Sequence, residues 1–199
     1  MNATITDLVE KIRVMEDELE VKMALARAEL NVRIEDGKIA FEKAVLRRHE
    51  EMKTHLVRYV LGARPLIALT APIIYSLIFP LLLLDLFITA YQAVCFPVYG
   101  IAKVRRREYL IFDRRYLAYL NALEKFNCAY CSYANGLIAY VREIASRTEQ
   151  YWCPIKHARK VVGAHAHYSE FAEFGDAQGY KDELAKAAER LQQKREGHA

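Results

Sequence analysis

Charged side chains are almost absent from residues 65–102, where Asp85 is the only one. A soluble domain in a chain of 199 residues rarely gathers so much apolar sequence in one block. A helix that crosses a bilayer core about 30 Å thick needs roughly 20 apolar residues. One helix over the whole block is too long for a simple span, and two spans would each be at the short limit. The sequence therefore predicts a membrane protein.

Catalytic motifs are also lacking. The chain has no phosphate-binding loop, no GxGxxG, no GxSxG and no HExxH pattern, and no convincing Ser/His/Asp arrangement. The N-terminus lacks the basic, apolar and small-residue succession of an export signal, so it is expected in the cytoplasm. These absences favour a non-enzymatic membrane-anchored subunit or scaffold.

Basic residues flank the apolar block on both sides. Two precede it and four follow it: Arg58, Arg64, Lys103, Arg105, Arg106 and Arg107. Because Lys and Arg mark the cytoplasmic side of membrane spans, this favours a membrane-embedded helical hairpin that enters and leaves at the same face. Three prolines, Pro72, Pro80 and Pro97, supply sites for a kink or reversal. A single tilted span and a buried soluble core are the alternatives.

The net charge of +4 is unevenly distributed. Residues 103–160 carry twelve basic and five acidic side chains, a local excess of +7, beside the apolar block. Each Lys or Arg near an anionic leaflet contributes roughly 1 kcal/mol of attraction. We expect Lys103, Arg105, Arg106 and Arg107 to bind lipid headgroups of anionic membranes, and no nucleic acid.

Proline is absent from residues 1–64, and good helix formers dominate there. Apolar residues recur at steps of three, four and four, which predicts one long amphipathic helix. The first stripe contains Ile12, Met15, Leu19, Met23, Ala26, Leu30, Ile34, Gly37, Phe41 and Val45. A second, roughly opposite stripe contains Val14, Val21, Leu25, Val32, Ile39 and Leu46. Two apolar faces predict a homo-oligomer through a coiled coil or a larger membrane complex, with an intramolecular helical layer as the alternative.

Residues 108–149 are predicted to form another long helix, with a tyrosine-rich apolar stripe. Cys128 and Cys131 lie on a neighbouring polar edge, and Cys153 and His157 follow after a spacer of twenty-one residues. Two close pairs at such a distance are typical of structural zinc sites. Iron or an iron–sulfur cluster would use the same ligands. The alternatives are ordinary packing residues, or a membrane-bound thiol–disulfide oxidoreductase that uses the CxxC pair.

Asp85 is an ionisable group inside an apolar block, so it is a candidate intramembrane polar site, or it reaches headgroups near a turn. Together with the tyrosine stripe, Asp85 leaves open a third function, an accessory subunit of a transport or electron-transfer complex.

The C-terminal part has two further features. His165 and His167 form an HxH pair in a predicted loop, and Asp176 is expected to cap a final helix over 178–195.

The predicted fold is an all-α membrane protein in four parts. Residues 1–64 form the oligomerisation helix and 65–102 the membrane-embedded hairpin. Residues 103–160 form the basic juxtamembrane domain with the Cys/His site, and 161–199 a loop and terminal helix. Both terminal regions are expected on the cytoplasmic side.

Overall fold

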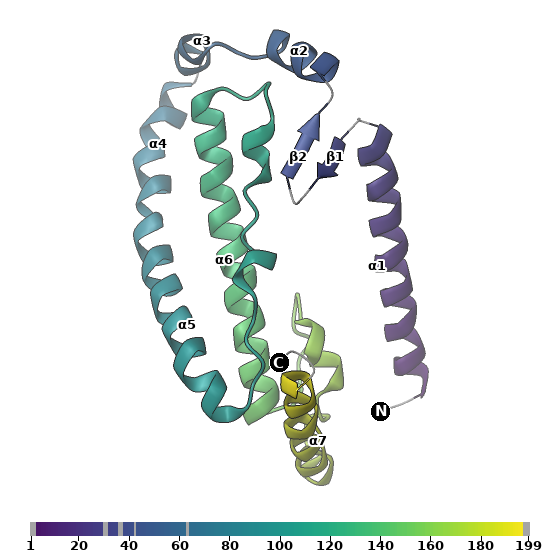
Figure 1. The fold of residues 1–199 in the computed structure, drawn as a ribbon. Coiled ribbons are helices and arrows are strands. Elements are labelled where there is room, and N and C mark those ends of the chain that lie inside the picture. Colours follow the sequence, from purple (N-terminus) through teal and green to yellow (C-terminus); the bar gives the residue numbers. More distant parts are fainter. Residues whose placement is uncertain (1–2, 30–31, 36–37, 42, 63, 197–199) are drawn as a thin grey trace. The chain divides into compact units, whose positions relative to one another are not determined.

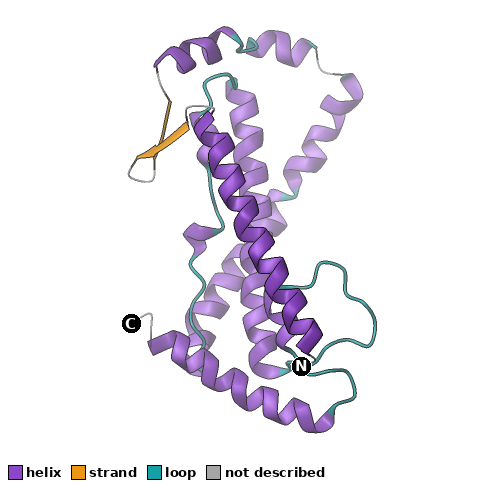
Figure 2. Ribbon diagram, turned by 90° about the vertical axis from the view of Figure 1, so that its right-hand side faces the viewer, coloured by secondary structure: helices purple, strands orange, loops and turns teal. Residues whose placement is uncertain are grey.

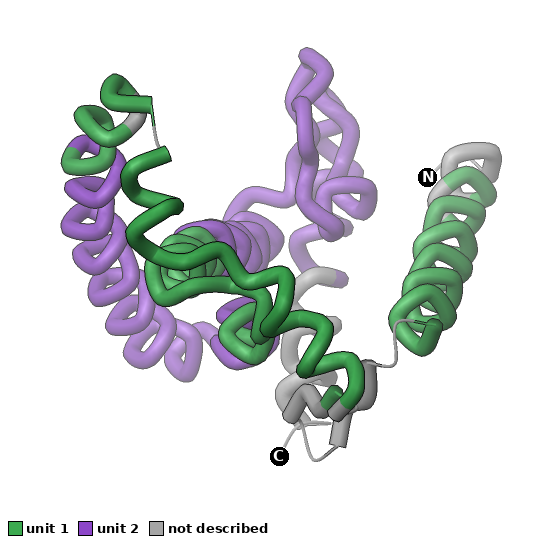
Figure 3. Tube along the Cα trace, turned by 90° about the horizontal axis from the view of Figure 1, so that it is seen from above, with its two compact units in different colours: residues 1–72, 112–133 green, residues 73–111, 134–199 purple. Residues whose placement is uncertain are grey.

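The computed structural model describes residues 3–29, 32–35, 38–41, 43–62 and 64–196. Most of these residues are helical, in agreement with the all-α prediction, and one two-stranded hairpin is added (Figures 1 and 2). The chain divides into two compact units (Figure 3): Met1–Pro72 with Phe112–Tyr133, and Ile73–Ile111 with Ala134–Ala199.

In the first unit, the described residues of the range 1–64 form five elements where the sequence predicts one helix. These are α1 (Ala3–Glu29), β1 (Val32–Glu35), β2 (Lys38–Phe41) and α2 (Lys43–Glu51), followed by α3 (Leu56–Leu61). The strands pair antiparallel, with Glu35 opposite Lys38. The prediction of a continuous helix over 1–64 is therefore wrong. Residues 32–41 alternate apolar and polar side chains around Asp36–Gly37, which is a signal for a tight hairpin.

The apolar block forms α4 (Pro65–Ser76) and α5 (Ile78–Tyr99). Leu77 joins them with right-handed helical angles (φ −64°, ψ −12°), so the chain does not reverse between them. Ala68–Tyr99 is thus one helical stretch of 32 residues, long and apolar enough to cross a membrane. The embedded hairpin is corrected to this single stretch, because the backbone stays helical at Leu77 between the two helices.

A return segment, residues 101–111, follows the left-handed glycine that ends α5 (Gly100, φ 71°). It contains the 3-10 turn η1 (Arg106–Glu108), and a second turn, η2 (Asp113–Tyr116), lies beyond it. The predicted helix over 108–149 in fact begins later, as α6 (Ala122–Trp152). Asn121 begins α6: its Oδ1 accepts from the N–H groups of Leu123 and Glu124, both at 3.0 Å, and Glu124 Oε2 accepts from its N–H at 2.9 Å. This reciprocal capping box is what stops the helix from starting earlier.

The core of the second unit lies between α5, the return segment and α6. These elements contribute the buried apolar side chains Phe96, Ile101, Val104, Leu137, Tyr140 and Ile144, and Phe171 and Ala172 are buried later in the same unit. The return segment approaches α6 closely at Gly136, where an added Cβ would meet the carbonyl oxygen of Tyr109 at 2.5 Å.

After α6 the chain forms the turn η3 (Ala166–Glu170) and the final helix α7 (Ala177–Glu196). Asp176 caps α7, with its Oδ1 accepting from the N–H of Gly179 at 2.8 Å, as the sequence predicts. Residues 154–156 are fixed against 172 by two backbone hydrogen bonds of 2.8 Å, which hold the turn region to the end of α6.

Candidate functional site

One side of α5 carries polar side chains that the rest of the second unit covers. We call Asp85, Gln92 and Phe96 the inner face of α5; all three are buried, at 7%, 6% and 0% exposure. They recur at seven and four residues, a spacing that keeps them on one side of a helix. The polar side of this otherwise apolar helix is therefore directed into the protein.

Arg106 of the return segment pairs with Asp85. Its Nη1 and Nη2 donate to the two carboxylate oxygens, each at 2.6 Å, and Thr89 Oγ1 donates to the same carboxylate at 3.3 Å. Two parallel charge-assisted hydrogen bonds are the strongest geometry for this pair of groups. The Asp85 side chain is 10% exposed and that of Arg106 is 44% exposed. Because water reaches the guanidinium more easily, the buried carboxylate is the group that needs the ion pair to offset its loss of hydration.

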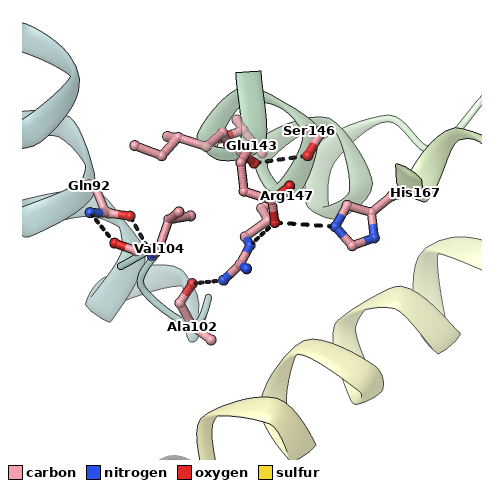
Figure 4. A network of polar contacts seen from close by, with 9 residues as sticks. Gln92, Ala102, Val104, Glu143, Ser146, Arg147 and His167 are labelled. Atoms are coloured by element: carbon pink, nitrogen blue, oxygen red, sulfur yellow. Dashed lines mark hydrogen bonds and ion pairs between the residues drawn. The ribbon is translucent and has the colours of Figure 1, made fainter. Parts of the chain in front are cut away.

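Gln92 connects three elements. Its Oε1 accepts from the backbone N–H of Val104 at 2.6 Å (Figure 4). Its Nε2 donates to Tyr140 Oη at 2.7 Å and to the Val104 carbonyl at 3.4 Å. A side-chain amide that satisfies a buried backbone in this way allows an extended segment to pack against an apolar helix.

A cluster of charged and histidine side chains lies near the end of α6; we call Glu143, Arg147, Glu149, His165 and His167 the histidine cluster. Arg147 Nε donates to Glu143 Oε1 at 2.7 Å and its Nη1 to the Ala102 carbonyl at 2.7 Å (Figure 4). His167 Nε2 lies 3.5 Å from the same Glu143 oxygen. The hydrogen bond from His167, followed by that from Arg147, lowers the pKa of Glu143 to about 2 against its burial.

The other histidine of the HxH pair contacts a second carboxylate. His165 Nε2 is 3.0 Å from Glu149 Oε2, and its ring packs against Tyr168 and Phe171. His165 and His167 connect η3 to α6 through Glu149 and Glu143. Arg147 connects α6 to the return segment through the Ala102 carbonyl. This arrangement orders the turn region.

The structure does not bring the predicted metal ligands together. Cys128 and Cys131 lie within α6, which continues through Thr148–Gln150, where the metal prediction requires a turn, and ends at Trp152. At about 1.5 Å per residue, roughly 30 Å of helix separates Cys131 from Cys153. Residues 3–29, 32–35, 38–41, 43–62 and 64–196 hold no group of three or more His, Cys, Asp or Glu side chains that could bind a metal ion. Zinc or iron binding stays a prediction.

The other predicted site residues differ in exposure and in their contacts. His157 contacts Tyr168, whose Oη is 2.7 Å from the His157 backbone nitrogen and 3.2 Å from Nδ1. Lys103, Arg105 and Arg107 are exposed and accessible to a headgroup, whereas Arg106 bonds to Asp85. Cys128 lies in the second turn of α6, beyond the first-turn position where a helix dipole activates a thiolate.

Gln92 and Glu143 are the structural residues that sequence reasoning missed. Gln92 carried a usable signal, since it lies seven residues from Asp85 inside the apolar helix and therefore on the same side.

Comparison with known proteins gave no matching family model, no matching curated protein and no matching solved structure. The functional argument rests on this chain's own residues.

Proposed function

We propose that the chain is a non-enzymatic, membrane-anchored scaffold or subunit, held to an anionic membrane by α4 and α5. The observation that carries this proposal is the helical stretch Ala68–Tyr99, which is strongly apolar and mostly exposed. A soluble protein rarely exposes so large a continuous apolar surface, which is a mark of membrane or protein contact. The exposed basic residues of the return segment add attraction to anionic headgroups.

Flotation with vesicles that contain anionic lipid tests this anchor. The wild-type protein should float with the vesicles and should stay bound after carbonate and high-salt washes, because apolar burial holds it. Glutamate at two exposed positions of α5, Leu83→Glu with Val94→Glu, should leave the protein unbound with unchanged helix content. Gln178→Glu, at an exposed position of α7, is the matched control and should float normally. Release of the wild type by either wash would refute the anchor.

We further propose that copies associate through α1. Large apolar side chains of α1 are exposed, among them Leu8, Ile12, Met15 and Leu19, whose steps of four, three and four match the seam of a coiled coil. In a parallel pair with these residues at the seam, Lys11 of one copy lies opposite Glu16 of the other. This charge complementarity favours a second copy of the same chain as the partner.

Size measurement in detergent tests the association. Each buried Ile or Leu contributes about 1.5–3 kcal/mol, so Ile12→Glu with Leu19→Glu should remove several kcal/mol and shift the protein to a smaller species. The matched control, Ala24→Glu with Ala28→Glu, adds the same charges on the opposite side of α1 and should leave the size unchanged. A monomeric wild type would remove this part of the proposal and leave the anchor intact.

A further inference from the structure

The exposed side of α5 is the reverse of its inner face. Leu83, Phe87, Val94 and Val98 are each more than half exposed. At 3.6 residues per turn these four side chains fall within about 60° of one another, and their centre lies roughly opposite Gln92. We call them the outer face of α5. The outer face is thus wholly apolar, whereas the inner side carries the polar residues Asp85, Thr89 and Gln92 together with Phe96.

The return segment runs back along the inner face, antiparallel to α5. Ile101 N–H donates to the Phe96 carbonyl at 2.9 Å, Val104 pairs with Gln92, and Arg106 pairs with Asp85. Residues 101–106 therefore lie beside residues 85–96. The return segment has exposed charged side chains at Lys103 and Arg105, and at Arg107 and Glu108 of η1.

This arrangement is incompatible with α5 crossing the hydrocarbon core. A crossing helix would carry the return segment to the same depth, where extended backbone and charged side chains cannot face lipid. Ala68–Tyr99 also measures about 48 Å at 1.5 Å per residue, against a core of about 30 Å. A crossing by residues 65–84 alone would leave Phe87, Val94 and Val98 in water.

We propose that α5 lies in the plane of the membrane surface, with its outer face among the acyl chains and the return segment on the aqueous side. This inference rests on the membrane anchor proposed above. The occupant of the outer face is one leaflet of an anionic bilayer. Four basic residues and one acidic residue in the return segment match its charge. In-plane helices bury an apolar side about 5–10 Å deep and keep charged groups at the headgroups.

Depth measurement along the outer face tests the orientation. Tryptophan is placed at Leu83, Phe87, Val94 or Val98, one position at a time, in the full chain with Trp152→Phe. The probe is a phosphatidylcholine–phosphatidylglycerol vesicle with bromine at one of several acyl positions. All four tryptophans should be quenched most by shallow bromines, at depths equal within a few ångströms. Tryptophan at Gln178, on α7, is the aqueous control and should not be quenched.

A crossing helix gives a different depth profile. Fifteen residues separate Leu83 from Val98, so their depths would differ by about 22 Å along the membrane normal. Such a gradient would overturn the in-plane orientation while leaving the anchor standing. Vesicle binding without quenching at any of the four positions would also overturn it. Failure to float would refute the anchor and the orientation together. Circular dichroism confirms that each variant keeps the wild-type helix content.

Discussion

Gln92 is the buried polar side chain whose loss should most weaken the packing of α5 against the rest of the second unit. The substitution Gln92→Met keeps the length of the side chain and removes its donor and acceptor. It leaves the Val104 N–H and Tyr140 Oη without their partner, at sites 5% and 1% exposed. An unsatisfied buried polar group costs about 1–3 kcal/mol. Two such groups, less the apolar gain of methionine, give a loss of about 2–4 kcal/mol.

Thermal unfolding in mild detergent, followed by circular dichroism, measures this loss. For a chain of this size each kcal/mol shifts the Tm by about 2–4 °C, so the expected decrease is roughly 5–15 °C. Gln178→Met makes the same chemical change at an exposed position and should stay within about 0.5 kcal/mol of wild type. A decrease for Gln92→Met no larger than that of the control would refute the reasoning.

A double-mutant cycle separates the Tyr140 contact from the rest. Tyr140→Phe removes the hydroxyl group that accepts from Gln92 at 2.7 Å. If the two side chains act together, the double variant should be less destabilised than the sum of the single variants, by about 0.5–3 kcal/mol. Strict additivity would mean that the Val104 backbone alone accounts for the effect of Gln92.

Three further predictions follow from contacts within the second unit. The pKa of Glu143 is lowered from 4.5 to about 2, so its carboxylate stabilises the fold above pH 4.5 and this contribution is lost as the pH falls toward 2. Glu143→Gln should therefore lower the free energy of unfolding at pH 7 by about 2 kcal/mol, allowing for partial screening, with the difference from wild type vanishing in acid unfolding curves. Gly136→Ala should cost about 1–3 kcal/mol in detergent melts, because its Cβ would lie 2.5 Å from the Tyr109 carbonyl oxygen. Burial and then the Glu149 charge raise the pKa of Cys153, so Glu149→Gln should modestly speed iodoacetamide labelling of Cys153 at pH 7.5 by mass spectrometry.

Features set by neighbouring residues could be predicted from the sequence. Asp176 precedes a charged, alanine-rich stretch, and a carboxylate at that position caps a helix because it accepts from the first-turn N–H groups. Asn121 and Glu124 have the three-residue spacing of a capping box, which predicts the start of α6 better than its apolar periodicity does. Local hydrogen bonding therefore explains where these helices begin.

The N-terminal hairpin was missed because two local signals conflict. A helical period of three and four fits residues 12–45, and alternation over residues 32–41 fits strands equally well. Asp36–Gly37 decides between them, since this dipeptide suits the backbone angles of a two-residue hairpin turn and weakens a helix. Weighing turn chemistry above periodicity at that point gives the observed strands.

The metal site and the ion pair of Asp85 depend on chain path, which spacing alone does not determine. The Cys/His spacing is compatible with one site only if the chain turns before Cys153, and α6 instead stays helical to Trp152. Asp85 and Arg106 are twenty-one residues apart and meet because the left-handed glycine at Gly100 sends the chain back along α5. Such a pairing is a tertiary property.

Asp85 acquires a structural explanation from this return path. An ionisable group in an apolar helix is costly unless it is paired, which is why it suggests an ion pathway when seen in sequence alone. Here Arg106 and Thr89 satisfy the carboxylate, and the same contact fixes the return segment along the inner face. Gln92 binds the backbone of Val104 further along. Asp85 and Gln92 together therefore decide which side of the helix faces protein. The apolar outer face is what remains, and it is the side available to a membrane.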